Sequence, residues 1–466
     1  MAKKYLLSLI GKIKTDQLVR GSLVIFLGST IVSAINYFYH MILGRMLGPT
    51  DYGIFASLLS LTYVYGIPVS VLNLVSLKYI SSLRQSGGVD KAAGFFNWFG
   101  KKILFFSLFL FLFSLVISPL VTGFLRLPSV FLVLLANVVT IIGIYGGYCS
   151  SVIQGFLRFG ITAFVSVSSS IFKIIFAVFF VYLGWRVTGV LFSQVISSLF
   201  FLFLVTFFIK NKISFPKGKI KEIRVPEKEM LKYAIPVLFS SLALTSFYTT
   251  DILLVKNLFP ANEAGLYASM AILGKIVFFA SSSIGMVMFP LVAGKRARGE
   301  NYRRIYLNSF LLVVFVSFSI TAVYFLFPEL MVNLLFGSQY LAIAPLLGLF
   351  AIFMSFYALV YLTVNFFLAA AKTAMIVLPL IGAVLQIVLI FLFHTSLRQV
   401  VLINIYVMAG LFFSLIALPL KKYVSSGQWR NFTLFGMFLF LLRSLCICLI
   451  LEPMFQLASE RLGGIS

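Results

Sequence analysis

Charged residues are scarce in this sequence, and their scarcity is the first guide to its class. Asp, Glu, Lys and Arg make up 11% of the 466 residues, whereas soluble domains typically hold about 25%. Hydrophobic residues make up 61% and the mean hydropathy is +1.09, so an ordinary soluble globular protein is excluded. The apolar residues form runs of about 20, the length of a helix that crosses a hydrocarbon core. The runs show no sustained alternation of period two, which argues against a membrane β-barrel.

The residues that usually carry catalysis or bind metals are also few. The chain has 2 His, 3 Cys and 12 acidic residues, and Cys149, Cys446 and Cys448 follow no metal-binding or disulfide spacing. It contains no Walker A sequence, no Gly-x-Ser-x-Gly and no zinc-binding spacing. We therefore expect a protein that is not an enzyme and that uses no cofactor, a coupling H⁺ or Na⁺ excepted.

The sequence contains instead a series of long apolar segments. Twelve of them have the length and composition of membrane-spanning helices, and a thirteenth follows near the C-terminus. We therefore predict an all-α, multi-pass integral membrane protein. The predicted spans are residues 22–43, 53–77, 103–123, 128–149, 161–183, 187–209, 233–257, 265–290, 305–327, 341–364, 373–393, 399–419 and 432–451.

Lys and Arg residues are distributed unequally over the connections between these spans. Alternate connections, starting with the N-terminal tail, hold 28 of the 37 basic residues, and the opposite connections hold six. Because basic loops stay in the cytoplasm, this asymmetry predicts a plasma-membrane protein with a cytoplasmic N-terminus. The formal net charge of +25 is then mainly a topology signal, with some attraction to anionic lipid head groups, and it requires no nucleic-acid partner. The six opposite residues are Arg45, Arg126, Arg186, Lys256, Arg398 and Arg461.

Two stretches of the sequence are similar enough to indicate an internal repeat. HMILGRMLGPTDYGIFAS, residues 40–57, and DILLVKNLFPANEAGLYAS, residues 251–269, align with Pro49 on Pro260 and with His40 on Asp251. Each stretch joins the first and second helices of a six-helix set, which predicts two parallel lobes of the same orientation. After one inserted residue, Gly53, Phe55, Ala56 and Ser57 align with Gly265, Tyr267, Ala268 and Ser269.

The longest basic connection separates the two six-helix sets. We predict an N-terminal lobe at residues 1–210, a cytoplasmic linker at 211–231 and a C-terminal lobe at 232–420, followed by an extra helix and tail at 421–466. Within the repeated stretch, Gly44, Gly48 and Pro49 are typical of a helix end and a tight turn. The stretch is thus interpreted as a turn at the outer membrane surface.

The residues of this turn carry a family resemblance. LGRMLGPTDYGIFASLLSL, residues 43–61, followed by a basic segment at 78–102, resembles the polysaccharide transport proteins. These are the lipid-linked oligosaccharide flippases of the multidrug/oligosaccharidyl-lipid/polysaccharide exporter superfamily, and the resemblance covers residues 1–420. It implies two six-helix lobes around a central cavity that opens to either side of the membrane in turn. It also implies a polyprenyl-pyrophosphate-linked sugar as cargo, without naming the sugar.

Ionisable groups inside the predicted spans are costly, and they are the first candidates for a binding site. Lys173 and Lys275 lie within spans of the first and second lobe, respectively. Each could bind an oxygen of a pyrophosphate, or could instead pair with a backbone carbonyl or extend toward the interface. One cation in each lobe would suit a doubly charged pyrophosphate.

Other polar residues in the spans follow helical spacing. Asp251 is a carboxylate well inside an apolar run; it could pair with a Lys, bind a coupling ion or occupy an interface position. A polar stripe along the first span ends at His40, and it indicates either a cavity wall or close helix packing. The predicted substrate-binding residues are Lys173, Lys275, Asp251, Asn36, His40, Ser33, Thr245 and Tyr248.

Together these features predict a transporter that flips a polyprenyl-pyrophosphate-linked oligosaccharide from the cytoplasmic to the outer leaflet by alternating access. Its partners would be this lipid-linked oligosaccharide, membrane lipids and other polysaccharide-assembly proteins. The alternative is a cation-coupled drug exporter of the same superfamily, although that branch typically has a membrane-embedded acid in its first lobe and this sequence has none. A membrane-bound sugar polymerase or ligase is less favoured because the predicted outer loops are short.

Overall fold

The computed structural model describes residues 17–424, apart from 214–224, 226, 371–374 and 376. Every regular element in these ranges is a helix, which confirms the predicted all-α class. Ten of the described helices are long and apolar enough to cross a membrane, and one more, Val377–Leu392, is apolar but shorter. The chain is thus a multi-pass membrane protein. The predicted thirteenth span, residues 432–451, lies outside the described residues, as does most of the predicted linker.

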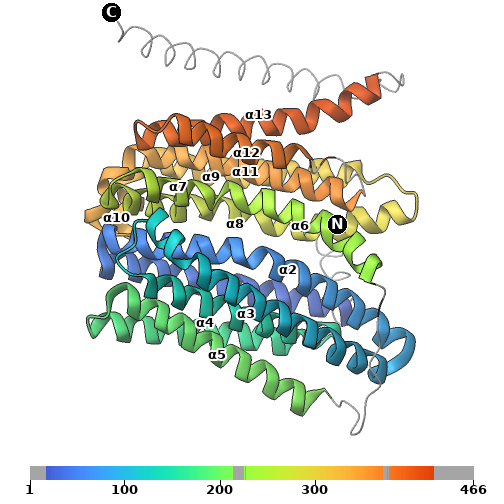
Figure 1. Cartoon of the computed structure of the whole chain (residues 1–466). Helices are drawn as coiled ribbons and strands as arrows, with labels where there is room; N and C mark the ends of the chain where they lie inside the picture. Colours follow the sequence, from blue (N-terminus) through green and yellow to red (C-terminus); the bar gives the residue numbers. More distant parts are fainter. Residues whose placement is uncertain (1–16, 214–224, 226, 371–374, 376, 425–466) are drawn as a thin grey trace, which may run out of the picture. The chain divides into compact units, whose positions relative to one another are not determined.

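The helices fall into two compact units. The first unit comprises residues Met1–Ser269 and Val332–Ala342, and the second comprises Met270–Met331 and Ile343–Ser466. The predicted division into lobes at 211–231 stays a prediction. The first unit contains α2 (Gln17–Phe124), α3 (Val130–Gly155), α4 (Phe159–Tyr182), α5 (Arg186–Lys212), α6 (Glu227–Phe247) and α7 (Thr250–Leu258) (Figure 1). The second unit contains α9 (Arg303–Leu326), α11 (Ala344–Ala369), α12 (Val377–Leu392) and α13 (Leu397–Val424). Three elements have residues in both units: α8 (Ala261–Ala297), α10 (Pro328–Leu335) and η1 (Ser338–Ile343).

The element α2 is three helical arms joined by tight turns. In a straight helix, residues 12 apart are separated by about 18 Å along the axis, yet the Nδ1 atom of His40 lies 3.0 Å from the hydroxyl oxygen of Tyr52. The chain reverses between them at Gly48, whose φ is 72°, and again at Gly88, whose φ is 75°. Glycine adopts this left-handed backbone without steric cost. The arms correspond to the predicted spans 22–43, 53–77 and 103–123.

The span predicted at 233–257 is broken into two helices. The helix α6 ends at Phe247 and α7 begins at Thr250. At the break, the Thr249 hydroxyl donates to the carbonyl oxygen of Thr245 at 2.8 Å, and the Ser246 and Thr250 hydroxyls lie 2.8 Å apart. Hydroxyl side chains that bond to nearby backbone groups compete with helical hydrogen bonding. The apolar run therefore has the length of one span but contains a discontinuity.

Three connections of the first unit that the charge asymmetry assigns to the cytoplasm contact one another in the structure. Lys102, after the second turn of α2, forms an ion pair with Glu227 at the start of α6. The guanidinium of Arg84 lies 5.2 Å from the centre of the Phe156 ring, between α3 and α4. These contacts join segments that the predicted topology places on the same side of the membrane.

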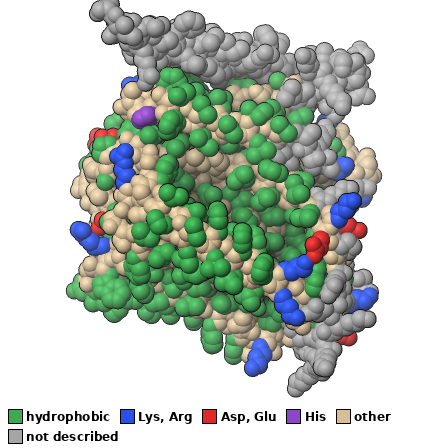
Figure 2. All heavy atoms as spheres, in the orientation of Figure 1, with side chains coloured by type: hydrophobic (Ala, Val, Ile, Leu, Met, Phe, Trp, Pro, Cys, Tyr) green, Lys and Arg blue, Asp and Glu red, His purple; other side chains and the backbone are tan. Residues whose placement is uncertain are grey.

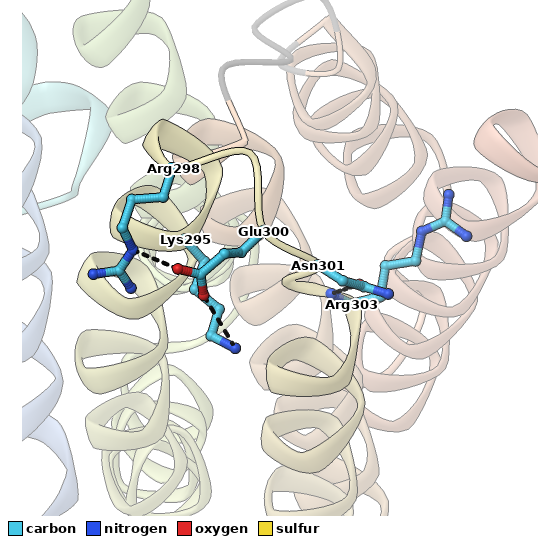
Figure 3. A network of polar contacts seen from close by, with 5 residues as sticks. All are labelled: Lys295, Arg298, Glu300, Asn301 and Arg303. Carbon is cyan, nitrogen blue, oxygen red and sulfur yellow. Dashed lines mark hydrogen bonds and ion pairs between the residues drawn. The ribbon is translucent and has the colours of Figure 1, made fainter.

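Polar and charged side chains in the connection between α8 and α9, in the second unit, contact one another (Figure 3). The Glu300 carboxylate accepts from the Arg298 Nε at 2.7 Å and lies 3.8 Å from the Lys295 ammonium. The Asn301 side-chain oxygen accepts from the backbone N–H of Arg303 at 3.0 Å, at the start of α9. All the charged groups of this connection are exposed, so their effect on stability is small.

Large apolar side chains cover much of the molecular surface. Phe105 and Val116 on the third arm of α2 are 74% and 76% exposed, and Phe318 on α9 is 72% exposed. Hydrophobic side chains likewise predominate on the face drawn in Figure 2, where few charged side chains are visible. A surface of this kind is unfavourable in water and suits contact with lipid.

A buried polar pair joins α12 to α13 and gives a first prediction. The side chains of Gln386 and Asn404 are both 0% exposed, and Gln386 Nε2 donates to Asn404 Oδ1 at 2.8 Å. Because interhelical hydrogen bonds in membranes contribute roughly 1 kcal/mol, Asn404→Leu should lower the thermal unfolding midpoint by about 2 °C in detergent. The double variant Gln386→Leu/Asn404→Leu should recover part of the loss, since it leaves no buried amide without its partner. A single variant as stable as the parent would contradict this prediction.

Candidate functional site

The predicted cation Lys173 lies in a polar group of the first unit. It extends from the middle of α4, and its ammonium donates to the side-chain oxygen of Asn36 at 2.6 Å. The same ammonium lies 4.4 Å from the centre of the Tyr39 ring, in cation–π geometry. Both partners belong to the first arm of α2, so the structure brings together two of the predicted site residues, Lys173 and Asn36, whose contact the sequence did not predict.

Side chains of α5 support this group from a third helix. Gln194 Nε2 donates to the Tyr39 hydroxyl at 3.4 Å, and the Ser197 hydroxyl donates to the carbonyl oxygen of Ser169 at 2.8 Å. Gln194 and Tyr39 were missed in the sequence analysis. Gln194 could have been noticed because it is a single amide inside an apolar run. A polar side chain in a membrane helix usually faces a polar partner in the protein.

The charge on Lys173 has no fixed counter-ion among the residues that the structure describes. Within the described part of the chain, no carboxylate lies within ion-pair distance of its ammonium. An ammonium has three donors, and one of them is directed at the side-chain oxygen of Asn36. The side chain is only half-buried. This arrangement can bind an anion, and the half-buried Ser33, one turn before Asn36, lies on the same arm.

His40 has a different environment from the rest of its predicted stripe. It is 8% exposed, its Nδ1 lies 3.0 Å from the Tyr52 hydroxyl, and its ring centre lies 5.9 Å from that of Phe55. The stripe therefore leads into a packed aromatic cluster at the turn between the first and second arms. Ser33 and Asn36 precede this cluster, and His40 is part of it.

Asp251 is likewise buried in side-chain contacts. It is 1% exposed; its Oδ2 accepts from the Tyr267 hydroxyl at 2.8 Å, and its Oδ1 accepts from the backbone N–H of Ile252 at 2.8 Å. Thr245 and Tyr248 lie at the break between α6 and α7, where the Tyr248 ring centre is 6.2 Å from that of Tyr63 on the second arm of α2. Three of the predicted site residues are thus grouped around the broken helix.

The two halves of the internal repeat make equivalent contacts. His40 packs on Phe55, and Asp251 bonds to Tyr267, which occupies the aligned position of the second stretch. The two aligned glycines also touch: a Cβ atom at Gly53 would lie 2.8 Å from the Cα atom of Gly265. The alignment made from the sequence therefore identifies structurally equivalent positions.

The turn between the first and second arms of α2 is a packing centre, which the sequence analysis did not predict. A Cβ atom at Gly265 would lie 1.7 Å from the carbonyl oxygen of Pro49, so only glycine fits this backbone approach. Arg45 Nη2 donates to the carbonyl oxygens of Asn333 at 3.2 Å and Leu334 at 2.6 Å, near the end of α10. The Tyr340 hydroxyl donates to the Gly44 carbonyl at 2.9 Å. Four segments of the first unit are thereby joined at this turn.

Lys275 belongs to the second unit and is 4% exposed. It lies on α8, next to Gly274, where an added Cβ atom would lie 2.3 Å from the Phe350 ring. The tight packing of this part of α8 against α11 explains the burial of Lys275. Because Lys173 lies in the other unit, the joint action of the two cations stays a prediction.

The described residues contain no group of three or more His, Cys, Asp and Glu side chains that could bind a metal ion. A coupling H⁺ or Na⁺ stays a prediction. The polar groups that are present suit hydrogen bonding and charge neutralisation at an anionic ligand.

Several solved structures share the fold of this chain. The chain is similar to an inward-facing multidrug resistance MATE family transporter of the MOP superfamily, with a TM-score of 0.69, 14% identity, and coverage of 84% of this chain and 96% of that one. An outward-facing structure of such a transporter gives a TM-score of 0.55 at 16% identity, with coverage of 87% and 96%. The chain is also similar to a MOP superfamily transporter from Pyrococcus furiosus, whose structure is described by the reverse polarity of its binding pocket. The TM-score is 0.53 at 15% identity, with coverage of 86% of this chain and 95% of that one. The fold is that of these transporters.

The sequence itself identifies the family within this class. Residues 42–345 match the family described as "Polysaccharide biosynthesis protein", and the chain belongs to that family. No curated protein sequence gives a significant match to the chain. The resemblance stated for residues 43–61 is confirmed, and so is the predicted fold of the exporter superfamily.

Proposed function

We propose that this protein moves a polyprenyl-diphosphate-linked oligosaccharide from the cytoplasmic to the outer leaflet by alternating access, with its N-terminus in the cytoplasm. The observation that carries the proposal is the ammonium of Lys173 inside a membrane-spanning helix, bonded to the neutral Asn36 and without a carboxylate partner among the described residues. A charge held at this depth is costly unless an anion compensates it. A diphosphate supplies such an anion, whereas a cationic drug would be repelled.

The neighbours of Lys173 suit the sugar that follows the diphosphate. Asn36 and Gln194 offer amide groups, and the half-buried Ser33 offers a hydroxyl. Tyr39 presents an aromatic ring close to the cation. Family membership supports the same cargo class, since the family is described by polysaccharide biosynthesis.

The membrane potential can give this movement its direction. Transfer of one negative charge from an inside-negative cytoplasm to the outside is favoured by about 2.3 kcal/mol at 100 mV. A cargo with two diphosphate charges would gain about twice this free energy. The proposal therefore requires neither ATP nor a resident cofactor.

A cation-coupled drug exporter is the second candidate. It is favoured by the similarity to a multidrug resistance transporter and by Asp251, a buried carboxylate beside a helix break. In that function Asp251 would take up H⁺ or Na⁺. The two candidates require cargoes of opposite charge, which makes them separable by experiment.

The test measures flipping of fluorescent polyprenyl-diphosphate sugars in proteoliposomes. Dithionite added outside quenches the labelled lipid that is exposed in the outer leaflet. We expect protein-dependent flipping that an inside-negative potential accelerates. Uptake of a cationic dye under an imposed Na⁺ or H⁺ gradient is measured in the same vesicles. Dye transport without lipid flipping would reject the proposal in favour of the drug exporter, and protein-free liposomes serve as the baseline.

A further inference from the structure

Four connections of the first unit meet around a cavity of about 520 Å³. They are the first turn of α2, the α2–α3 connection, the α4–α5 connection and the start of α8. The charge asymmetry of the sequence assigns all four to the outer side of the membrane. The volume lies in the range of small-molecule sites, roughly 300–1,000 Å³.

The cavity has an excess of positive charge. Arg126, Arg186 and Lys256 line it, and they are three of the six basic residues predicted on the outer side. One carboxylate, that of Asp51, lines it as well and lies 3.3 Å from the Nε of Arg186. Basic residues that are rare on this side of the protein are therefore concentrated at one place.

Lys256 is the most informative of these cations. It is only 3% exposed, and no hydrogen bond or ion pair joins it to any residue that the structure describes. An ammonium on a side chain with so little exposure is only partly solvated, so pairing with an anion would stabilise it. Since Lys256 borders the cavity, an anion inside it would provide the missing partner.

The N-terminus of α5 adds backbone donors to the same cavity. Arg186, Val187 and Thr188, the first residues of this helix, all line it. The N-cap residue Trp185 makes no side-chain capping bond, whereas the neighbouring α3 is capped by Ser129, which accepts from the N–H of Phe131 at 3.1 Å. The first N–H groups of a helix have no intrahelical partner and carry a partial positive charge, which favours anions.

Two of the cations are held by unusual backbone geometry. Arg126 and Arg186 have φ values of 48° and 43°, in the left-handed region that normally favours glycine. Such strain is concentrated at functional sites, where it positions particular side chains. Here it positions the two guanidinium groups that border the cavity.

From this geometry we infer a binding site for a phosphate-bearing ligand, formed by Arg126, Arg186, Lys256 and the N-terminus of α5. Guanidinium groups bind phosphate oxygens in bidentate fashion, and the ammonium of Lys256 supplies a point charge. Lys173 does not line this cavity, and its contacts are with Asn36 and Tyr39. The inferred site therefore goes beyond the proposed function. Its ligand is either a phosphate at the head of a membrane lipid or a free phosphate or diphosphate.

The test uses the full-length protein in nanodiscs of phosphatidylcholine, with inorganic pyrophosphate as the probe and calorimetry as the readout. We expect saturable binding to the parent protein that Lys256→Met and Arg126→Gln each weaken at least tenfold. Arg398→Gln removes the same charge from an exposed residue on the predicted outer side and should leave the affinity unchanged. Lys256→Arg should restore most of the binding, which distinguishes a charge effect from damage to the fold.

A second arm separates the two sources of phosphate. Nanodiscs that contain phosphatidic acid should lose pyrophosphate binding if the site accepts a lipid head group, and should keep it if the ligand is soluble. If the parent protein binds neither probe, or if all variants bind as the parent does, the site is rejected. Because no arm measures flipping, a failure here is independent of the cargo.

Discussion

Replacing Lys173 by Met is expected to slow flipping of polyprenyl-diphosphate sugars by about tenfold to a hundredfold. The variant loses a charge-assisted hydrogen bond to the cargo, which contributes about 1.5–3 kcal/mol. The thermal unfolding midpoint should be unchanged or higher, because the variant removes a charge from the interior of a span. The measurement is the dithionite assay with the labelled lipid, together with the unfolding midpoint in detergent.

Matched variants make this prediction specific. Lys173→Arg keeps the charge and should retain more flipping than Lys173→Met. Lys78→Met removes one charge from the basic connection at 78–102 and should leave the rate unchanged. Equal flipping by the parent protein and Lys173→Met would remove the observation on which the proposed function depends. A gain in cationic-dye transport by Lys173→Met would instead favour the drug exporter.

Gly265→Ala is expected to have the second large effect, on the stability of the first unit. The added Cβ atom would lie 1.7 Å from the Pro49 carbonyl oxygen, a backbone atom that cannot move without displacing the turn between the first and second arms of α2. Overpacking of this kind typically costs about 1–3 kcal/mol. We expect the thermal unfolding midpoint to fall by several degrees and the flipping rate to fall with it.

A graded series of glycine variants tests this explanation. At Gly53 the added atom would lie 2.8 Å from the nearest atom, so Gly53→Ala should be less harmful than Gly265→Ala. Gly143, within α3, has no such neighbour within 4 Å, and Gly143→Ala should be neutral or slightly stabilising. A series in which all three variants behave alike would show that the backbone contact at the turn does not limit stability.

The sequence was sufficient for the fold class, because span length and charge asymmetry are properties of the chain that the membrane alone imposes. It was also sufficient for the repeat, since the aligned residues prove to be equivalent in the structure. It placed Lys173 in the middle of a helix, as the structure does, but position along a helix does not determine which neighbouring helix a side chain faces. The contact with Asn36 depends on how α4 packs against the first arm of α2, and helical spacing does not contain that information.

Two further residues show the same limit. His40 follows the spacing of the polar stripe, yet the chain reverses after it and brings Tyr52 and Phe55 onto its ring. Lys256 was counted only as one outer basic residue, although the structure buries it beside a cavity. In both cases the decisive neighbours come from tight turns and from connections that meet in space. The broken helix at Thr249 was missed for a related reason, because hydropathy averages over a local change in hydrogen bonding.

The contact between Gly53 and Gly265 also bears on the origin of the chain. Two aligned residues that touch each other occupy the place where a two-fold axis would pass through a symmetric assembly of two half-length chains. In such an ancestral homodimer one codon would have specified both glycines. A single substitution would then have placed a Cβ atom too close to backbone atoms at both positions. Once both halves lie in one chain, each position can change separately, and the aligned positions His40 and Asp251 differ in this sequence. At the glycines, by contrast, the space beside Gly53 is limited by the backbone of Gly265, and the space beside Gly265 by the backbone of Pro49.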